Sequence, residues 1–365
     1  MANIEVAGLH KKFDNFTAVI NSNFKIRDGE FFVILGPSGC GKTTTLRMIA
    51  GLELPTSGKI LLDDEDVSFE RASNRDIAFM FQMFALYPHM NVKENICFPL
   101  KCQGYSKAAI AEKLAEVARI LRIEHILDNK ISSLAGGDRQ RVALGRAIIR
   151  EPKAFLMDEP LGALDSEFRH DMTIELRELH IKMKATTVYV THDQLEAMML
   201  ADRIMIMNHG IIEQIGTPAE IYNKPRSLFV AKFVGEPPMN FLSIESAVDK
   251  DSDYVYVEST KISIPKILDK PDSQDLLLGF RPDQVNVSQT YLDNALNGVV
   301  QASEYFGTNQ VLTIACASGV LKARIPAETQ FKEGENVYVT LKPEKLIVFD
   351  EGSGQAVLST YLVEK

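Results

Sequence analysis

One segment limits the possible folds of this chain more than any other: a glycine-rich loop that directly follows an apolar run. Residues 31–35 read FFVIL, and an unbroken run of this kind is typical of a strand buried on both faces of a parallel sheet. Residues 36–43 read GPSGCGKT and fit the pattern G-x-x-x-x-G-K-[ST]. Residues 42–51 then show helical spacing of apolar side chains. The segment therefore predicts a strand, a phosphate-binding loop and a helix in succession.

The loop has the composition that phosphate binding requires. Its glycines let successive backbone N–H groups converge on an anion, because a Cβ atom would obstruct the turn. The positive end of the following helix dipole points toward the same anion. In this pattern Lys42 reaches the β- and γ-phosphates and the Thr43 hydroxyl binds Mg²⁺. The predicted nucleotide-binding residues of the loop are Gly36, Pro37, Ser38, Gly39, Cys40, Gly41, Lys42, Thr43 and Thr44.

Two carboxylates follow a second apolar run. Residues 154–157 read AFLM, and Asp158 and Glu159 come next. At the end of a strand, Asp158 can hold Mg²⁺ through water, and Glu159 is placed to polarise an attacking water. An acidic pair after a strand is by itself more often a helix cap or a solvated feature. Together with the upstream glycine-rich loop, the pair predicts nucleotide hydrolysis.

The alternation of segments predicts two domains. Helical and strand-like stretches alternate as far as residue 207, which indicates a mostly parallel sheet with flanking helices. After residues 235–238, which read GEPP, the segments become short and strand-like and are punctuated by Gly, Asp and Asn. That pattern is typical of an all-β, barrel-like domain. We therefore expect a domain boundary near residue 235.

Composition excludes several classes of protein. The chain of 365 residues carries 49 acidic and 40 basic side chains, a net charge of -9, whereas a dedicated nucleic-acid-binding protein is usually basic. Its four cysteines lack C-x-x-C spacing, which favours reduced thiols in a cytosolic protein. No run approaches the about 18 apolar residues that span a bilayer, and the first residues lack the apolar core of a signal peptide. We expect a chain that is neither secreted nor integral to a membrane.

Four further segments indicate the class of nucleotidase. Residues 133–141, which read SLAGGDRQR, closely resemble the signature segment of ATP-binding cassette (ABC) proteins. Gln82 resembles the Q-loop glutamine of that family, and residues 163–165 (ALD) resemble its D-loop. Residues 191–193 (THD) resemble the segment that carries the family's switch histidine. All four occur in the order of that family.

The resemblance extends over essentially the whole chain. The chain is similar to the ATPase subunits of carbohydrate-type importers, and residues 235–241 (GEPPMNF) and 279–282 (GFRP) resemble parts of their C-terminal β-barrel domain. The resemblance implies an α/β P-loop cassette over residues 1–235, with a parallel-sheet core, an antiparallel β subdomain and a helical subdomain at about residues 86–150. It implies an OB-like β-barrel domain of the TOBE type over residues 236–365.

The resemblance also implies roles for single residues, with ATP and Mg²⁺ as cofactors. Gln82 would join Thr43 and Asp158 around Mg²⁺, and Glu159, His192 and Gln82 would form the catalytic set. Phe13 would stack on adenine, although a core role for Phe13 is an alternative because Phe16 lies nearby. Asp165 would lie in the D-loop at a dimer contact.

The signature segment departs from the family pattern. The usual sequence is Leu-Ser-Gly-Gly-Gln, whereas this chain has Ala135, Gly136, Gly137 and Asp138 after Leu134. In the family, this segment faces the nucleotide of a second ATPase chain. Ala135 lacks a hydroxyl that would donate to the γ-phosphate, and Asp138 adds a negative charge to an anion site. We therefore expect a heterodimer with a second ATPase subunit. The alternative is a homodimer that tolerates both substitutions.

The overall expectation is an ATPase that powers import of a small polar solute of the sugar, polyol or glycerol-phosphate class. Its expected partners are membrane-spanning permease subunits and, indirectly, an extracytoplasmic solute-binding protein, with no nucleic acid. Residues 84–90 (FALYPHM) would line a groove for a short helix of the membrane subunit, or else form a satellite core cluster. The expected location is peripheral, on the cytoplasmic face of the inner membrane. The alternatives are a soluble ABC ATPase without a transport role and a weakly hydrolysing regulatory subunit.

Overall fold

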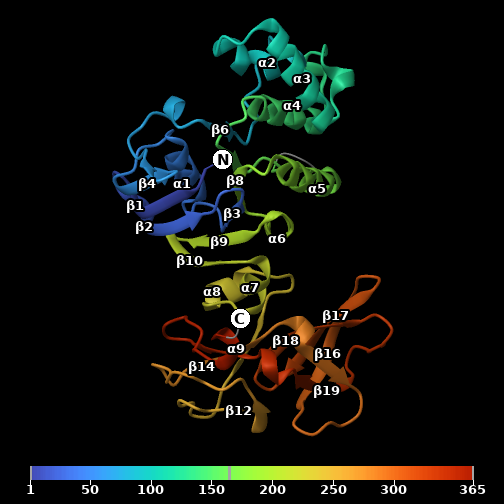
Figure 1. The fold of residues 1–365 in the computed structure, drawn as a ribbon. Helices are drawn as coiled ribbons and strands as arrows, with labels where there is room; N and C mark the ends of the chain where they lie inside the picture. The colour runs from blue at the N-terminus through green and yellow to red at the C-terminus, as the bar shows by residue number, and fades with distance from the viewer. Residues whose placement is uncertain (1, 163–165, 364–365) are drawn as a thin grey trace. The chain divides into compact units, whose positions relative to one another are not determined.

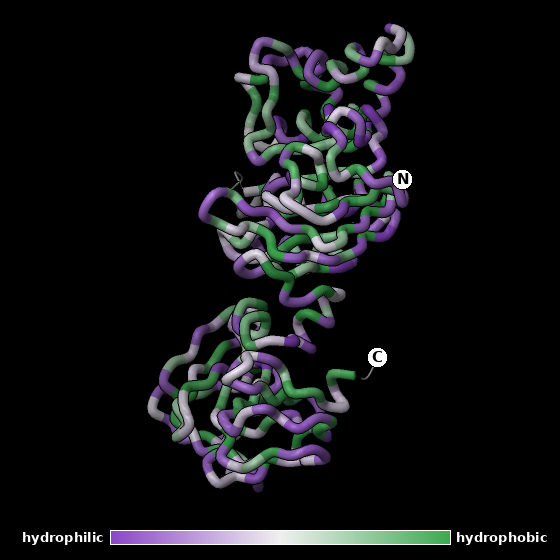
Figure 2. Tube along the Cα trace, turned by 90° about the vertical axis from the view of Figure 1, so that its left-hand side faces the viewer, coloured by the Kyte–Doolittle hydropathy of each residue, from purple (hydrophilic) through white to green (hydrophobic). Residues whose placement is uncertain are grey.

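The computed structural model describes residues 2–162 and 166–363, apart from the side chains of residues 166–168. The chain forms two compact units, Met1–Pro218 and Ala219–Lys365, which we call the first and second units (Figure 1). Among the described residues, no helix has both the length and the apolar character needed to cross a membrane. Hydrophobic stretches instead alternate with hydrophilic ones along the chain of each unit (Figure 2).

A six-stranded sheet forms the centre of the first unit. In spatial order its strands are β10 (Ile211–Gly216), β9 (Arg203–Asn208), β3 (Phe31–Leu35), β8 (Thr186–Thr191), β7 (Ala154–Asp158) and β6 (Ile77–Met80). All neighbours pair in parallel except β10, which is antiparallel to β9. Every residue of β3, β7 and β8 is buried, as the apolar runs predicted.

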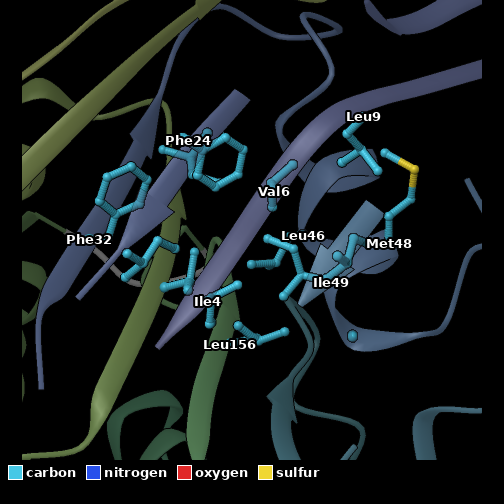
Figure 3. Packing of buried hydrophobic residues seen from close by; sticks show 14 of the residues in the cluster. Ile4, Val6, Leu9, Phe24, Phe32, Leu46, Met48, Ile49 and Leu156 are labelled. Atoms are coloured by element: carbon cyan, nitrogen blue, oxygen red, sulfur yellow. The ribbon is translucent and has the colours of Figure 1, made fainter. Parts of the chain in front are cut away.

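An antiparallel sheet packs near the glycine-rich loop. Its strands are β2 (Phe16–Ile26), β1 (Ile4–Phe13), β4 (Ser57–Leu62) and β5 (Glu65–Asp66), and helix α1 (Lys42–Ala50) follows the loop. Side chains from both sheets and from α1 form one hydrophobic cluster (Figure 3). Its labelled members are Ile4, Val6, Leu9, Phe24, Phe32, Leu46, Met48, Ile49 and Leu156. This cluster anchors the loop between β3 and α1.

Besides α1, the described helices of the first unit are α2 (Val92–Cys102), α3 (Lys107–Leu121), α4 (Gly136–Ile148), α5 (Ser166–Met183) and α6 (Gln194–Leu200). Short 3₁₀ turns cover Ala72–Asn74, Glu124–Ile126 and Ile131–Ser133. Helices α2, α3 and α4 pack against one another (Figure 1).

The helix boundaries differ from the sequence patterns at three places. Apolar residues recur at helical spacing from Lys107 to Ile126, but α3 ends at Leu121 because Arg122 adopts a left-handed φ of 57°. Helix α4 begins at Gly136, inside the signature segment. Helix α2 was not predicted, because Pro99 lies inside it. Its usable signal was the capping box at its start, formed by Asn91 and Glu94.

The second unit is an antiparallel β structure with three short helices. A five-stranded sheet has the order β15 (Val285–Ser288), β19 (Asn336–Leu341), β16 (Leu296–Tyr305), β17 (Asn309–Cys316) and β18 (Gly319–Pro326). Strands β15 and β18, at its opposite edges, contact each other, so the sheet curls into a barrel. The remaining elements are β11 (Asn240–Ser243), β14 (Leu276–Phe280), β20 (Ile347–Asp350), β12 (Tyr254–Val257), β13 (Thr260–Ser263), α7 (Pro218–Asn223), α8 (Leu228–Phe233), α9 (Thr360–Val363) and 3₁₀ turns at Pro282–Gln284 and Pro343–Lys345. The two units together confirm the expected fold class.

The compact units divide at Pro218, whereas the sequence pattern placed the boundary near residue 235. The difference comes from α7 and α8, which are bonded to the β structure through the fully buried Arg281. Its guanidinium donates to the carbonyl oxygens of Tyr222 (2.8 Å), Ala231 (3.2 Å) and Val234. The composition change at residues 235–238 thus marks the start of the strands rather than the boundary between the compact units.

Candidate active site

The loop between β3 and α1 is built so that only glycine fits at its two ends. A Cβ atom on Gly36 would lie 2.2 Å from the carbonyl oxygen of Met207, and one on Gly41 would lie 2.3 Å from that of Ala18. Gly41 also has a φ of 105°, which side chains rarely allow. The backbones of β9 and β2 therefore support the loop from outside.

Lys42 carries the positive charge of this loop. Its ammonium group donates to the carbonyl oxygens of Gly36 (2.8 Å) and Pro37 (2.9 Å), and the residue is only 4% exposed. Helix α1 has no side-chain cap at Gly41 and no acidic residue in its first turn. Burial raises the pKa of the neighbouring Cys40 thiol, although the Lys42 charge opposes the shift. A raised thiol pKa disfavours the reactive thiolate, so Cys40 fills space in the loop rather than reacting.

Thr43 and Asp158 meet beside the loop. The Thr43 hydroxyl donates to Asp158 Oδ1 at 2.7 Å, and Arg47 lies 3.9 Å from Asp158 Oδ2. Burial raises the pKa of Asp158, and the nearby Glu159 carboxylate adds to that effect. A hydroxyl and a carboxylate oxygen are the hard ligands that Mg²⁺ prefers. The donor set that these two residues offer therefore fits the metal that the sequence predicts.

Glu159 brings together the other predicted catalytic residues. Its Oε2 atom lies 3.3 Å from His192 Nδ1 and 3.3 Å from Gln82 Nε2. These residues follow β7, β8 and β6, which are adjacent parallel strands, so their carboxyl ends deliver all three to one edge. Glu159 has a left-handed φ of 47°, and its N–H donates to the carbonyl of Val190 at 3.0 Å. The strained backbone turns the carboxylate away from the strand.

A buried carboxylate fixes the segment that carries His192. Glu196 Oε2 accepts hydrogen bonds from Tyr189 (2.8 Å) and Thr191 (2.7 Å), and the Thr191 hydroxyl accepts one from the Asp193 N–H (3.0 Å). Burial raises the pKa of Glu196, although both hydroxyl bonds oppose the shift. Sequence reasoning missed Glu196. Its available signal was an acidic residue in the first turn of the helix after the THD segment.

Phe13 lies at the end of β1 with its ring exposed. The residue is 41% exposed, and Phe16, opposite it in the hairpin, is 58% exposed, so Phe13 is not a core residue. Lys11 places its ammonium 4.6 Å from the Phe13 ring centroid and donates to Glu53 (2.6 Å) and to the Leu54 carbonyl. An exposed ring of this kind can present a face to a planar base.

The signature segment forms the start of α4. Ala135 is the N-cap and offers no side-chain cap, and Gly136, Gly137 and Asp138 form the first turn. Asp138 Oδ1 lies 3.7 Å from Arg141 Nη1. Arg141 also donates to both carboxylate oxygens of Glu175, at 2.9 and 3.2 Å. The predicted D-loop residue Asp165 lies outside the described residues.

A groove lies between β6, α2 and α4. Its volume is about 400 Å³, and its lining includes Phe84, Tyr87, Phe98, Pro99 and Arg146. Residues 84–90 are irregular in structure, and two of their aromatic residues, Phe84 and Tyr87, line this groove.

Comparison with known proteins places these features in a family. An ABC transporter model matches residues 19–162, and a TOBE domain model matches residues 278–349. The chain is 40% identical to the trehalose/maltose import ATP-binding protein MalK of Thermococcus litoralis, over 98% of this chain and 100% of the relative. It is 42% identical to the sn-glycerol-3-phosphate import ATP-binding protein UgpC of Yersinia pseudotuberculosis, over 97% of this chain and 99% of the relative.

Solved structures give the same result for the fold. The structure of cbiO1 from Clostridium perfringens, part of an ABC transporter complex, matches with a TM-score of 0.56 and 26% identity. That match covers 60% of this chain and 89% of the other. The dimeric structure of a bacterial ABC transporter cassette matches with a TM-score of 0.54 and 31% identity, covering 59% of this chain and 98% of the other. The chain therefore belongs to the ATP-binding proteins of the ABC transporter family.

Proposed function

We propose that this chain is the ATP-hydrolysing subunit of an importer for a small polar solute of the sugar, polyol or glycerol-phosphate class. The observation that carries this proposal is the meeting of Glu159, His192 and Gln82 at one edge of the parallel sheet. The full-length relatives named for trehalose/maltose and glycerol-3-phosphate import support the solute class.

ATP binds through its phosphates at the loop of residues 36–43 and through its base at Phe13. On binding, the phosphate oxygens replace the Gly36 and Pro37 carbonyls as acceptors for Lys42, and the bare start of α1 faces the same charge. Thr43, Asp158 and the side-chain oxygen of Gln82 would hold Mg²⁺. When bound, the ion neutralises charge that develops on the β- and γ-phosphate oxygens.

Glu159 acts as the general base. Its carboxylate accepts a proton from water as the water oxygen bonds to the γ-phosphorus, while the bond from that phosphorus to the bridging oxygen breaks and ADP leaves. His192 donates a hydrogen bond to the transferring phosphoryl group and stabilises its charge in the transition state. Gln82 orients the water. Because Gln82 and His192 both contact Glu159, a movement of either segment changes the position of the base.

The first unit works as one half of an ATPase dimer, with the start of α4 facing the nucleotide of the other half. We favour a second, different ATPase subunit as the partner, because Ala135 and Asp138 weaken the contact of the start of α4 with the partner's nucleotide. The intact residues of its own site are Lys42, Asp158 and Glu159. Co-purification with the products of neighbouring genes tests this pairing, and assembly of the chain only with itself would rule out the heterodimer.

The groove lined by Phe84, Tyr87 and Phe98 receives a short helix of a membrane-spanning permease subunit, which places the chain on the cytoplasmic face of the inner membrane. An extracytoplasmic solute-binding protein acts through that permease. The cassette is assigned to residues 1–235, with residues 86–150 as its helical subdomain, and the TOBE-type domain to residues 236–365. The β domain resembles that of importers and favours import over export.

Reconstitution tests the proposal. The chain would be purified with its neighbouring permeases, placed in proteoliposomes and supplied with ATP and the solute-binding protein. ATP-dependent uptake of a sugar, a polyol or a glycerol phosphate is the expected result. ATPase activity without association with any membrane subunit would instead indicate a soluble, non-transport ATPase. An assembled complex that does not hydrolyse ATP would indicate a regulatory subunit.

A further inference from the structure

Helix α4 is bonded to the groove wall through Arg146. The side chain lies in the last turn of α4, and its Nη1 and Nη2 donate to the carbonyl oxygens of Ala85 and Phe84, each at 2.8 Å. The guanidinium carbon also lies 5.3 Å from the centroid of the Tyr87 ring. Two consecutive carbonyls and one ring face therefore receive a single planar cation, a geometry that a lysine ammonium cannot reproduce.

The backbone that Arg146 holds is strained. Phe84 has a φ of 60° and Ala85 a φ of 47°, so two successive side-chain-bearing residues adopt the left-handed region. Such a conformation persists only where the surroundings stabilise it. Local bonds from the Phe84 N–H to the Phe81 carbonyl (2.9 Å) and from the Ala85 N–H to the Met83 carbonyl (2.6 Å) close the turn, and the two bonds from Arg146 add stabilisation from a different element. Without them, we expect this part of the loop to relax toward ordinary backbone angles.

The loop that Arg146 holds also carries Gln82. Gln82 lies two residues before Phe84 and contacts Glu159 through its amide. We call the two hydrogen bonds from Arg146 to this loop the Arg146 clamp. Helix α4, which carries Arg146, begins at Gly136 after the N-cap residue Ala135. Arg146 thus connects three features: the groove, the segment that reaches the catalytic carboxylate, and the helix whose start faces a second nucleotide.

We propose that Arg146 is a positioning residue that couples occupation of the groove to the placement of Gln82 and of helix α4. This inference rests on the proposed function, because it assigns the groove to a membrane partner. A helix that enters the groove beside Phe84 and Tyr87 moves the loop. Because Arg146 bonds the loop to α4, that movement shifts the whole of α4 as well. By linkage, nucleotide binding must alter the groove to the same extent.

Hydrogen exchange in the isolated chain tests the clamp without any membrane partner. Arg146→Lys keeps the charge but loses the two-pronged bond, so exchange in residues 83–90 should become about ten-fold faster and lose its response to a non-hydrolysable ATP analogue. Arg119→Lys is the matched control, because Arg119 lies exposed in the last turn of α3, outside the lining of the groove. It should change exchange in residues 83–90 less than about two-fold.

A purely structural role would speed exchange throughout the first unit and lower its unfolding temperature. The proposal requires acceleration confined to residues 83–90, with the core strands unchanged. Exchange in Arg146→Lys that equals the parent, or that rises across the whole unit, would overturn the proposal. Either result stands whether or not the chain proves to be an importer subunit.

The assembled transporter gives the second measurement. The quantity is the ratio of ATPase rates with and without permease and solute-loaded binding protein. In Arg146→Lys this ratio should fall toward one, whereas Arg119→Lys should keep the parent's ratio. An unchanged ratio in Arg146→Lys contradicts the coupling role. If the parent chain shows no stimulation by any permease, the proposed function fails instead, and the exchange experiment still decides the clamp.

Discussion

Two helices of the first unit begin with bare N-termini, and they differ in the charges around them. Neither the Gly41 cap of α1 nor the Ala135 cap of α4 makes a side-chain hydrogen bond. The first turn of α1 has no acidic residue, whereas the first turn of α4 contains Asp138. Because an N-terminus attracts anions, the start of α1 is left for an external phosphate, and the start of α4 already has a carboxylate beside it.

The surroundings of the two helices extend the difference. Beside the loop before α1, Asp158 accepts a hydrogen bond from Thr43, and Glu159 and His192 lie 3.3 Å from each other. At α4 the charges are paired within the chain, since Arg141 contacts both Asp138 and Glu175. The glycine-rich start of α1 thus lies beside catalytic side chains, whereas the positive end of the dipole of α4 is partly neutralised by Asp138.

The largest expected effect is the loss of ATP hydrolysis when the site beside α1 loses its base. Glu159→Gln removes the base but keeps the size and polarity of the side chain, so steady-state phosphate release should fall at least about 100-fold while ATP still binds. The measurement is ATPase activity of the assembled complex together with ATP titration. Glu151→Gln is the control, because Glu151 forms an exposed ion pair with Lys113 outside the site. A Glu159→Gln variant that retains a tenth of the rate would remove Glu159 from its assigned role.

Restoring the usual signature sharpens the comparison at α4. Ala135→Ser combined with Asp138→Gln returns a hydroxyl donor and removes a negative charge, so the ATPase rate of the dimer should rise about ten-fold. The rate is measured in the assembled complex, with each single substitution as a control for additivity. An unchanged rate in the double variant would mean that the start of α4 is not weakened.

The sequence predicted the glycine-rich loop and helix α1 far better than it predicted the hydrogen bonds between distant segments. The order of β3, the glycine-rich loop and α1 was predictable because apolar runs and glycine spacing are local signals. The grouping of Gln82, Glu159 and His192 was implied by the family resemblance. The parallel pairing of β6, β7 and β8 explains it, because parallel strands end at one edge.

Long-range hydrogen bonds could not be predicted in the same way. Arg146 bonds to Ala85 and Phe84, which lie 61 and 62 positions earlier, and Arg281 bonds to Tyr222 and Ala231, which lie 59 and 50 positions earlier. Neither side chain carries a local signal of its partner. Packing, not composition, therefore decided that the compact units divide at Pro218 rather than near residue 235.

A smaller effect tests whether the nucleotide site at α1 also binds the base of the nucleotide through Phe13. Phe13→Ala removes an exposed ring, and loss of a stacking contact of about 0.5–1.5 kcal/mol should weaken ATP binding about two- to ten-fold. Calorimetric titration of ATP measures the affinity. Phe16→Ala, which removes the exposed ring opposite in the same hairpin, is the matched control and should leave it unchanged. Equal losses in both variants would mean that the hairpin, not Phe13, contributes to binding.

The smallest effect compares the two aspartates themselves, in protein held free of nucleotide with a chelator present. Burial raises the pKa of Asp158. A raised pKa means that this group's contribution to stability is full below the ordinary aspartate pKa and is lost as pH rises through the raised value. Asp158→Asn keeps an oxygen for Thr43 without that loss, so it should unfold at a higher temperature than the parent at neutral pH.

The difference should shrink on acidification toward about pH 4, near the ordinary aspartate pKa. Asp138→Asn should act in the opposite direction at neutral pH, lowering the unfolding temperature by about 1–3 °C, because it removes a charge that faces Arg141 and the start of α4. Thermal unfolding of both variants across pH measures the two signs. Shifts of the same sign at neutral pH would mean that the charges of Asp158 and Asp138 affect stability in the same direction.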